Sequence, residues 1–282
     1  MKVIVAKSAG FCWGVKRAVE QARKLAQQEQ HAIYTDGSLI HNRQMMDQLR
    51  GENIMELRDP SLARDKVILI RAHGIPPDRY KMLESVTSRL VDMTCPDVAS
   101  IQRLVAQRAR EGFHIVVFGD PGHAEVEGLL GHAMGRGFVV SGPDDISRLP
   151  DSASLCVVSQ STQLPESYKK VADEIRCRFP SALVLDTICK STKNRQNDLV
   201  GLAKIVEAIV VVGDPHSANT MRLVDLAKTL RPTFHIAVKE DLDEGELRRF
   251  NVVGLTAGAS TPSFVLDAVR TALLELHGVE PA

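Results

Sequence analysis

The feature that most constrains the fold is a strand–helix pattern that occurs three times along the 282 residues. Cys12, Cys95 and Cys189 stand at near-equal spacing. Each follows a short apolar stretch and precedes a segment whose apolar residues recur at helical spacing. Each of these segments is then followed by three further strand-like runs and two further helical runs, joined by polar turns. A repeat of this kind indicates three similar domains.

Alternating strands and helices predict parallel sheets joined by right-handed crossovers. We therefore expect an α/β fold, in which three similar small α/β domains with parallel sheets form a trefoil around a pseudo-threefold axis. The predicted domains cover residues 1–95, 96–188 and 189–282. Residues 1–11 form a candidate strand that could instead pair with the sheet of the third domain.

The charge balance restricts the partners of the chain. Lys and Arg together number 35, as do Asp and Glu, so no overall basic field favours nucleic acid or a membrane surface. No apolar run approaches the ~20 residues of a membrane-spanning helix. Five cysteines in a chain without a signal-like segment indicate reduced thiols. The composition predicts a soluble cytoplasmic protein.

The three repeated cysteines predict a metal centre. A helix N-terminus favours the thiolate, and Pro96 suits the first turn of the helix that follows Cys95. Equivalent placement around a shared axis would bring three thiolates together, and a cation would have to hold them. A zinc site and a [4Fe–4S] cluster with one iron not ligated by cysteine are both compatible with three cysteines. Cys156 and Cys177 are interpreted as structural residues.

Polar turns predict an anion site. Loops at the carboxyl ends of parallel strands are the usual ligand sites of α/β folds, and histidines, hydroxyls and glycine-rich backbone suit a ligand with many oxygens, such as a diphosphate. Glu125 is a better acid candidate than Glu127, because it is expected to point with His123 toward the pseudo-threefold axis. The absence of GxGxxG and GxxxxGK[ST] motifs argues against a nicotinamide or nucleotide site, so if the protein is a redox enzyme we expect its electrons to come from another protein. The turns supply His41, His73, His123, Ser161, Ser217 and Ser260.

Six motifs carry a resemblance to a known family. They are "GFCWGVKRA", "RAHGIPP", "TCPDV", "GHAEVEG", "DTICKSTKNRQ" and "TAGASTP", in this order along nearly the whole chain. The chain resembles the 4-hydroxy-3-methylbut-2-enyl diphosphate reductase family, which acts last in the methylerythritol phosphate route of isoprene biosynthesis. The resemblance implies a trefoil around a central [4Fe–4S] cluster, with Cys12, Cys95 and Cys189 as its ligands.

The resemblance also implies roles for the polar residues. The family reduces an allylic diphosphate with two electrons and two protons, and it yields isopentenyl and dimethylallyl diphosphates. An external donor such as ferredoxin or flavodoxin supplies the electrons. Glu125, Ser161 and Thr162 correspond to the residues that deliver a proton to the leaving hydroxyl. The residues expected to bind the diphosphate are His41, His73, His123, Ser217, Asn219 and Ser260.

Four positions depart from the family pattern. Ser161, Ala218, Ala124 and Met93 stand where the family usually has threonine, serine, proline and a small residue. None of them is a cluster ligand or the acid. They leave two alternatives open, a paralogous [4Fe–4S] reductase or dehydratase with a different allylic substrate and a non-enzymatic redox or metal sensor. The sequence does not fix the electron donor, the product ratio or the oligomeric state.

Overall fold

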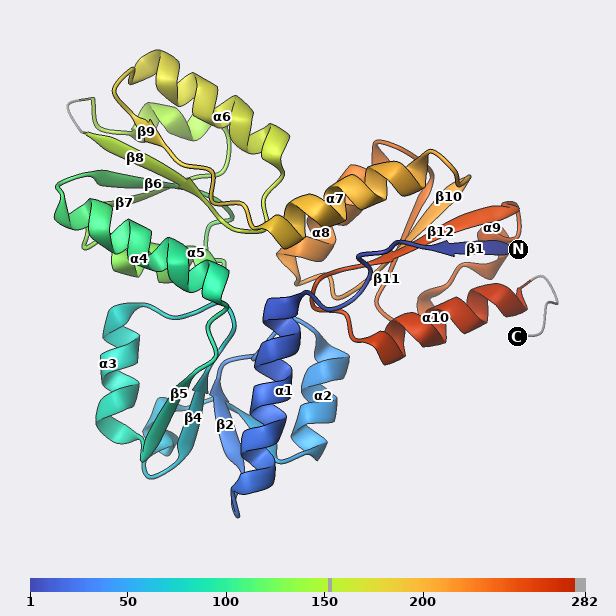
Figure 1. Ribbon diagram of the computed structural model, residues 1–282, viewed down its shortest axis with the longest axis horizontal. Coiled ribbons are helices and arrows are strands. Elements are labelled where there is room, and N and C mark those ends of the chain that lie inside the picture. The colour runs from blue at the N-terminus through green and yellow to red at the C-terminus, as the bar shows by residue number, and fades with distance from the viewer. Residues whose placement is uncertain (152–153, 277–282) are drawn as a thin grey trace. The chain divides into compact units, whose positions relative to one another are not determined.

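The computed structural model describes residues 1–151 and 154–276, and they contain three four-stranded sheets whose paired strands all run parallel (Figure 1). The prediction of an α/β fold with parallel sheets is confirmed. The first sheet has the order β3(Ile54–Leu57), β2(Ile33–Asp36), β4(Val67–Ile70), β5(Arg89–Asp92). The second has the order β7(Gly137–Val140), β6(His114–Phe118), β8(Leu155–Ser159), β9(Leu183–Val184). The third has the order β1(Lys2–Val5), β12(Val252–Ala257), β10(Ala208–Val212), β11(Thr233–Ile236).

The three sheets repeat one topology. In the first two sheets the strand that comes first in the chain pairs with the second and the third, and the fourth lies at the far edge. The third sheet follows the same order through β10, β11 and β12, but β1 takes its fourth position. Val3 is in register with Val253 in this pairing. The domain boundaries at residues 95 and 188 stay predictions.

Helices begin immediately after the three repeated cysteines. α1(Trp13–Gln28) follows Cys12, α4(Pro96–Arg110) follows Cys95, and α7(Lys190–Ala203) follows Cys189. Each cysteine therefore stands where its backbone enters the first turn of a helix. The remaining helices are α2(Arg43–Gly51), α3(Pro77–Val86), α5(Ala124–His132), α6(Pro165–Arg178), α8(Ala218–Lys228), α9(Glu244–Leu247) and α10(Ser263–Glu275), with short 3₁₀ turns at η1(Pro60–Ala63), η2(Pro143–Arg148) and η3(Lys239–Asp241).

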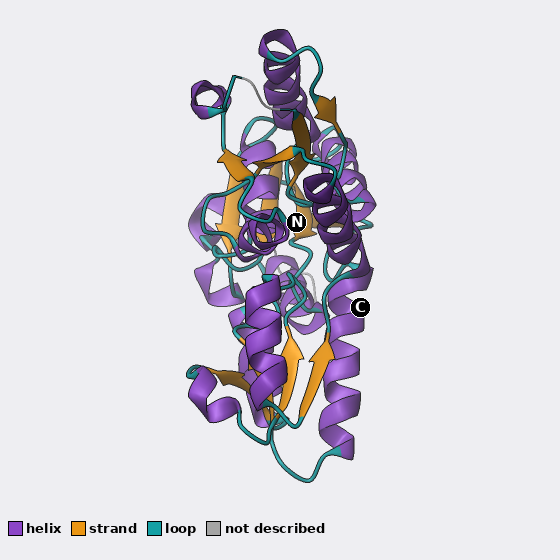
Figure 2. Cartoon of the chain, turned by 90° about the vertical axis from the view of Figure 1, so that its left-hand side faces the viewer, coloured by secondary structure: helices purple, strands orange, loops and turns teal. Residues whose placement is uncertain are grey.

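Helices cover both faces of the sheets (Figure 2), which explains why an inner strand such as β10 is apolar throughout. In β10, Val210 and Val212 pack in one cluster with Leu266 of α10. Alternate residues of the same strand, such as Val211, pack in another cluster with Leu199 of α7. Successive side chains of a strand point to opposite faces, so this alternation follows directly from the run of valines.

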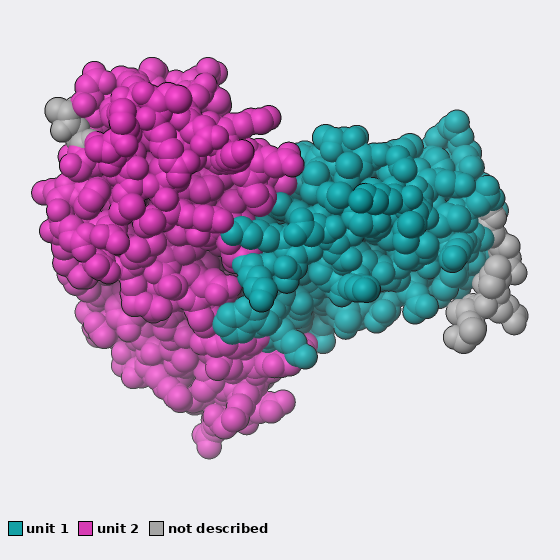
Figure 3. All heavy atoms as spheres, turned by 45° about the horizontal axis from the view of Figure 1, so that its top comes forward, with its two compact units in different colours: residues 1–16, 40–48, 190–282 teal, residues 17–39, 49–189 magenta. Residues whose placement is uncertain are grey.

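The chain divides into two compact units (Figure 3). The smaller unit comprises Met1–Lys16, Ile40–Gln48 and the chain from Lys190 onward, and it contains the third sheet. The larger unit comprises Arg17–Leu39 and Leu49–Cys189, and it contains the first and second sheets. None of the described helices combines the length and the apolarity that crossing a membrane requires.

Candidate active site

The predicted acid–base and diphosphate-binding residues follow the carboxyl ends of the two inner strands of each sheet, whereas the three predicted cluster cysteines follow edge strands. Between the inner strands of each sheet the strand order reverses, and open parallel sheets commonly bind ligands at such a point. The polar turns of the sequence therefore coincide with the topological switch points. His41 follows β2, His73 follows β4, His123 and Glu125 follow β6, Ser161 and Thr162 follow β8, Ser217 and Asn219 follow β10, and Ser260 follows β12.

A buried carboxyl group lies at the switch point of the second sheet. Glu125 is the second residue of α5, and its side chain is only 2% exposed. The backbone N–H of Ser161 donates to its Oε1 over 2.6 Å, and the Ser161 hydroxyl bonds to its Oε2 over 2.8 Å. These two bonds join the loop after β6 to the loop after β8, across 36 positions in the sequence.

The surroundings of Glu125 tune it for proton transfer near neutrality. Burial raises the pKa of Glu125 to about 7, because an ionised carboxylate loses its hydration there. The two bonds from Ser161 lower this pKa, and the charge of Asp120 raises it. A carboxyl group whose pKa lies close to the working pH can both hold and release a proton.

His123 caps the helix that carries Glu125. Its Nδ1 accepts the backbone N–H of Glu125 over 3.1 Å, so the neutral ring carries its proton on Nε2. The rings of His73 and His123 meet edge to face, with their centroids 5.6 Å apart. The larger unit thus brings two of the three predicted histidines together and fixes His123 as an Nε2–H donor.

Two of the repeated cysteines are tied to the same loops. The backbone N–H of Cys95 donates to the carbonyl of Ala72, next to His73, over 2.9 Å. The backbone N–H of Cys189 donates to the carbonyl of Ser161 over 3.0 Å. Backbone bonds therefore link Cys95 and Cys189 directly to loops that carry predicted ligand-binding or acid–base groups.

The smaller unit repeats this arrangement around Cys12. The backbone N–H of Cys12 donates to the carbonyl of Ala259 over 3.1 Å, and the hydroxyl of the next residue, Ser260, lies 3.2 Å from that of Ser217. Ser217 caps α8 by accepting the N–H of Thr220. Cys12 is therefore bonded to the residue that precedes Ser260, as Cys189 is bonded to Ser161 in the larger unit.

Asn219 and Asp214 complete the polar part of the smaller unit. Asn219 is 6% exposed, and its Nδ2 has no hydrogen-bond partner among the described residues. An unsatisfied buried donor is costly, so this amide favours a ligand that offers an acceptor. Asp214 is also buried and accepts the backbone N–H of Arg43 over 3.0 Å, which fixes the loop that carries His41.

Sequence reasoning missed one buried cation. Arg195 of α7 is 2% exposed, and its guanidinium donates to the carbonyls of Ser8, Gly10 and Ala257. These bonds fasten the segment before Cys12 to α7 and to the end of β12. The motif "KSTKNRQ" contains Arg195, but its partners lie more than sixty positions away, so no local pattern identifies them.

The two remaining cysteines differ from each other. Cys156 is fully buried in β8, and burial raises the pKa of its thiol to about 11, as a structural residue requires. Cys177 is exposed on α6 and contributes to no core. The structural interpretation is therefore wrong for Cys177: its helix turns that position toward solvent.

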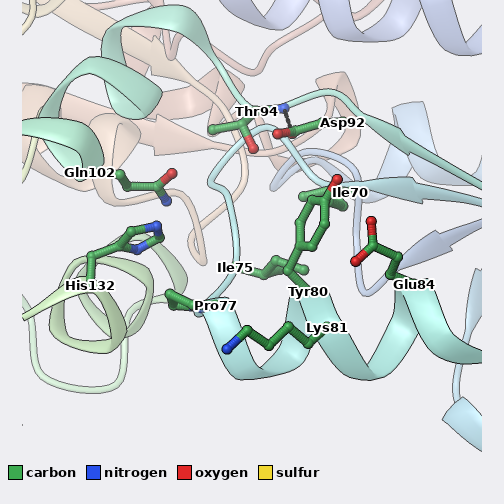
Figure 4. Close-up of a pocket in the computed structure, with 10 residues that line it drawn as sticks. All are labelled: Ile70, Ile75, Pro77, Tyr80, Lys81, Glu84, Asp92, Thr94, Gln102 and His132. Atoms are coloured by element: carbon green, nitrogen blue, oxygen red, sulfur yellow. Dashed lines mark hydrogen bonds between the residues drawn. The ribbon is translucent and has the colours of Figure 1, made fainter. Parts of the chain in front are cut away.

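A separate cleft of about 430 Å³ lies in the larger unit. Its floor includes Ile70 and Ile75, and α3 presents Tyr80, Lys81 and Glu84 to it, opposite Gln102 and His132 (Figure 4). None of the site residues predicted from the sequence lines this cleft. The cleft is therefore distinct from the site predicted from the sequence.

Comparisons with known proteins agree with the motifs. The family model described as LytB protein matches residues 3–274. The 4-hydroxy-3-methylbut-2-enyl diphosphate reductase of Opitutus terrae is 44% identical over 282 residues, which cover 95% of this chain and 98% of that protein.

Two solved structures are similar to the chain. The E-1-hydroxy-2-methyl-but-2-enyl-4-diphosphate reductase from Plasmodium falciparum has a TM-score of 0.92 at 26% identity, covering 97% of this chain and 88% of that one. A second structure, of (E)-4-hydroxy-3-methyl-but-2-enyl diphosphate reductase, has a TM-score of 0.73 at 35% identity, covering 98% and 100%. The chain belongs to the LytB protein family.

Proposed function

We propose that this protein is an iron–sulfur oxidoreductase that removes the hydroxyl group of 4-hydroxy-3-methylbut-2-enyl diphosphate. The substrate takes up two electrons and two protons, its C–O bond breaks, and water leaves. The products are isopentenyl and dimethylallyl diphosphates. The buried Glu125–Ser161 pair carries the proposal, because it supplies a proton donor at a switch point of a LytB-family chain.

Cys12, Cys95 and Cys189 would hold a [4Fe–4S] cluster with one iron not ligated by cysteine. Each of these thiols is partly exposed and directly precedes a helix, a position that favours the thiolate. Cysteine thiolates are the usual ligands of such clusters, so the donor set fits. When bound, the cluster supplies electrons and a Lewis-acidic iron for the substrate oxygen.

Glu125 and Ser161 form a directed path for the proton. The backbone N–H of Ser161 occupies Oε1 of Glu125, so a proton on the carboxyl group resides on Oε2. That oxygen lies 2.8 Å from the Ser161 hydroxyl, which can accept this proton and pass its own to the substrate oxygen. Hydroxide is a poor leaving group, so protonation at this point lowers the barrier to C–O cleavage.

We assign diphosphate binding to the remaining polar groups of the switch points. His123 offers an Nε2–H donor because its Nδ1 is occupied, and Asn219 offers a buried amide that lacks a protein partner. Such preorganised donors suit phosphate oxygens. The full set proposed to bind the diphosphate is His41, His73, His123, Ser217, Asn219 and Ser260.

Anaerobic protein reconstituted with iron and sulfide tests the proposal. Supplied with the substrate and reduced methyl viologen, it should release both diphosphate products, and reduced ferredoxin or flavodoxin should replace the viologen. Glu125→Gln keeps the shape of the side chain but removes the acid, so turnover should fall by about 10²–10⁴-fold. Absence of products from cluster-loaded wild-type protein would overturn the proposed reaction.

Ala218 supports a second candidate, a related reductase that acts on a different allylic alcohol. It is the first residue of α8, between Ser217 and Asn219, and it lacks the hydroxyl that the family usually has there. Competition between the hydroxybutenyl diphosphate and other allylic alcohols in the same assay distinguishes the two candidates. A higher kcat/KM for another alcohol would favour the second.

A further inference from the structure

We propose that Gln160 is a positioning residue that turns the hydroxyl proton of Thr162 toward the bound ligand. Gln160 is fully buried directly after β8, and Thr162 lies two residues further on, at the start of the accessible loop. This assignment rests on the proposed function, which identifies the ligand as the allylic diphosphate. Thr162 would then be a fixed hydrogen-bond donor and not a freely rotating hydroxyl.

The orientation of the Gln160 amide follows from its partners. The backbone N–H of Asp120 points at Oε1 of Gln160 over 3.0 Å. A backbone nitrogen can only donate, so the atom facing it must be the amide oxygen. The side-chain nitrogen of Gln163 lies 3.3 Å from the same oxygen and adds a second donor. A flipped amide would set its own N–H group against the backbone N–H.

The nitrogen of the Gln160 amide fixes the direction of the hydrogen bond to Thr162. Nε2 of Gln160 lies 3.1 Å from Oγ1 of Thr162. An amide nitrogen donates and does not accept, so the Thr162 oxygen is the acceptor of this bond. Its own proton must point elsewhere, and the described residues offer no acceptor for it. The half-exposed side of Thr162 is the direction that remains.

Neighbouring hydroxyls in this loop thus have different tasks. The Ser161 hydroxyl bonds to Glu125 over 2.8 Å and belongs to the proton path. The Thr162 hydroxyl lies outside that pair and is oriented by Gln160. Because the donor is already aligned, a ligand oxygen that meets it does not have to compete with an alternative protein acceptor.

Gln160→Glu tests the direction of the hydrogen bond between residue 160 and Thr162 with an almost isosteric side chain. The introduced carboxylate can still accept the Asp120 N–H, but it cannot donate to Thr162, whose hydroxyl would then turn inward. At pH 8.5 we expect kcat/KM to fall by on the order of 10²-fold, and Gln160→Met, which abolishes the bond without reversing it, should cost about tenfold. Thr162→Val should match Gln160→Glu, and the double variant should lose little more.

The pH profile separates positioning from a merely structural role. Three described titratable residues bond to this loop: Asp120 through Gln163, Glu125 through Ser161, and Cys189, whose backbone N–H donates to Ser161. His123 caps the helix that carries Glu125. When the introduced carboxyl group is protonated, it can donate to Thr162 again. The ratio of the Gln160→Glu to the wild-type kcat/KM should therefore rise as the pH falls from 8.5 to 6. Gln107→Glu, an exposed substitution on α4, is the matched control and should give a ratio that does not change with pH.

A second measurement does not depend on turnover. In ¹⁵N-labelled protein without substrate, the Gln160 side-chain amide proton should exchange slowly with solvent, and Thr162→Val should accelerate this exchange. Fast exchange in the wild type, or a Gln160→Glu variant with wild-type kcat/KM at every pH, would overturn the role of Gln160. A slowly exchanging amide in a protein that does not reduce the substrate would overturn only the proposed reaction.

Discussion

Replacing Glu125 by Gln should change the pH dependence of stability as well as activity. The folded protein holds this carboxyl group with a pKa of about 7, whereas an unperturbed glutamate has a pKa of 4.5. The folded state therefore binds the proton more tightly than the unfolded state. Between pH 4.5 and 7 the unfolded chain gains stability by ionising, while the folded chain cannot, so the free energy of unfolding falls as the pH rises.

The size of this loss follows from the two pKa values. Each pKa unit of difference corresponds to 1.36 kcal/mol. The free energy of unfolding is therefore lower by about 3 kcal/mol once the pH exceeds 7. Most of this loss of unfolding free energy, about 2–3 kcal/mol, occurs between pH 5 and pH 8.5. Glu125→Gln imitates the protonated carboxyl group and does not ionise. The variant should therefore gain stability relative to the wild type by this amount over that range.

Thermal unfolding at several pH values provides the assay, with both proteins in the same cluster-loaded, anaerobic state. The midpoint of Glu125→Gln should exceed that of the wild type by several degrees more at pH 8.5 than at pH 5. Glu127→Gln is the matched control, because Glu127 lies exposed in the same helical turn. Its midpoint should follow that of the wild type at every pH.

A third variant tests the cause of the pKa shift. The bonds from Ser161 lower the pKa of Glu125 and oppose the effect of burial. Ser161→Ala removes the hydroxyl bond, so the decline in stability should extend to higher pH. If Glu125→Gln and the wild type differ by a constant amount from pH 5 to pH 8.5, Glu125 does not titrate near neutrality and the reasoning fails.

Three further predictions concern other parts of the chain. Serine at any one of the three proposed cluster cysteines should abolish bound iron and sulfide, measured chemically, whereas Cys156→Ala should retain both. Arg195→Met should lower the free energy of unfolding by about 3–5 kcal/mol, measured by denaturant unfolding, because three buried carbonyls lose a charged donor. Ala218→Ser should strengthen substrate binding by roughly 0.5–1.5 kcal/mol in a calorimetric titration, and weaker binding would contradict the proposed substrate.

Local patterns predicted the elements well, because each depends on neighbouring residues. Apolar runs of four or five residues form parallel strands in the structure. The segments with helical spacing after Cys12, Cys95 and Cys189 form α1, α4 and α7. The polar turns between them were predicted as ligand loops and indeed lie at the switch points of the three sheets. Periodicity and turn composition are sufficient for this level of the fold.

Contacts between distant segments could not be predicted in the same way. The sequence offered both Ser161 and Thr162 as partners of Glu125, whereas the structure bonds Ser161 to Glu125 and Thr162 to Gln160. Which of two adjacent hydroxyls meets a carboxylate 36 residues away depends on how the loop turns after β8. The partners of Arg195 could not be predicted either, because its acceptors are backbone carbonyls. Every residue has such a carbonyl, so the residue types do not identify which ones accept.

The pairing of β1 with β12 has a consequence for synthesis of the protein on the ribosome. Residues 2–5 emerge early, but their partner, residues 252–257, is made near the end of the chain. At 5–20 residues per second, β1 waits roughly 10–50 seconds for it. The first and second sheets need no later strand and can form meanwhile. Cys12, whose N–H bonds to Ala259, reaches its final position only after translation has passed that residue, so the proposed cluster can be completed only late in translation or afterwards.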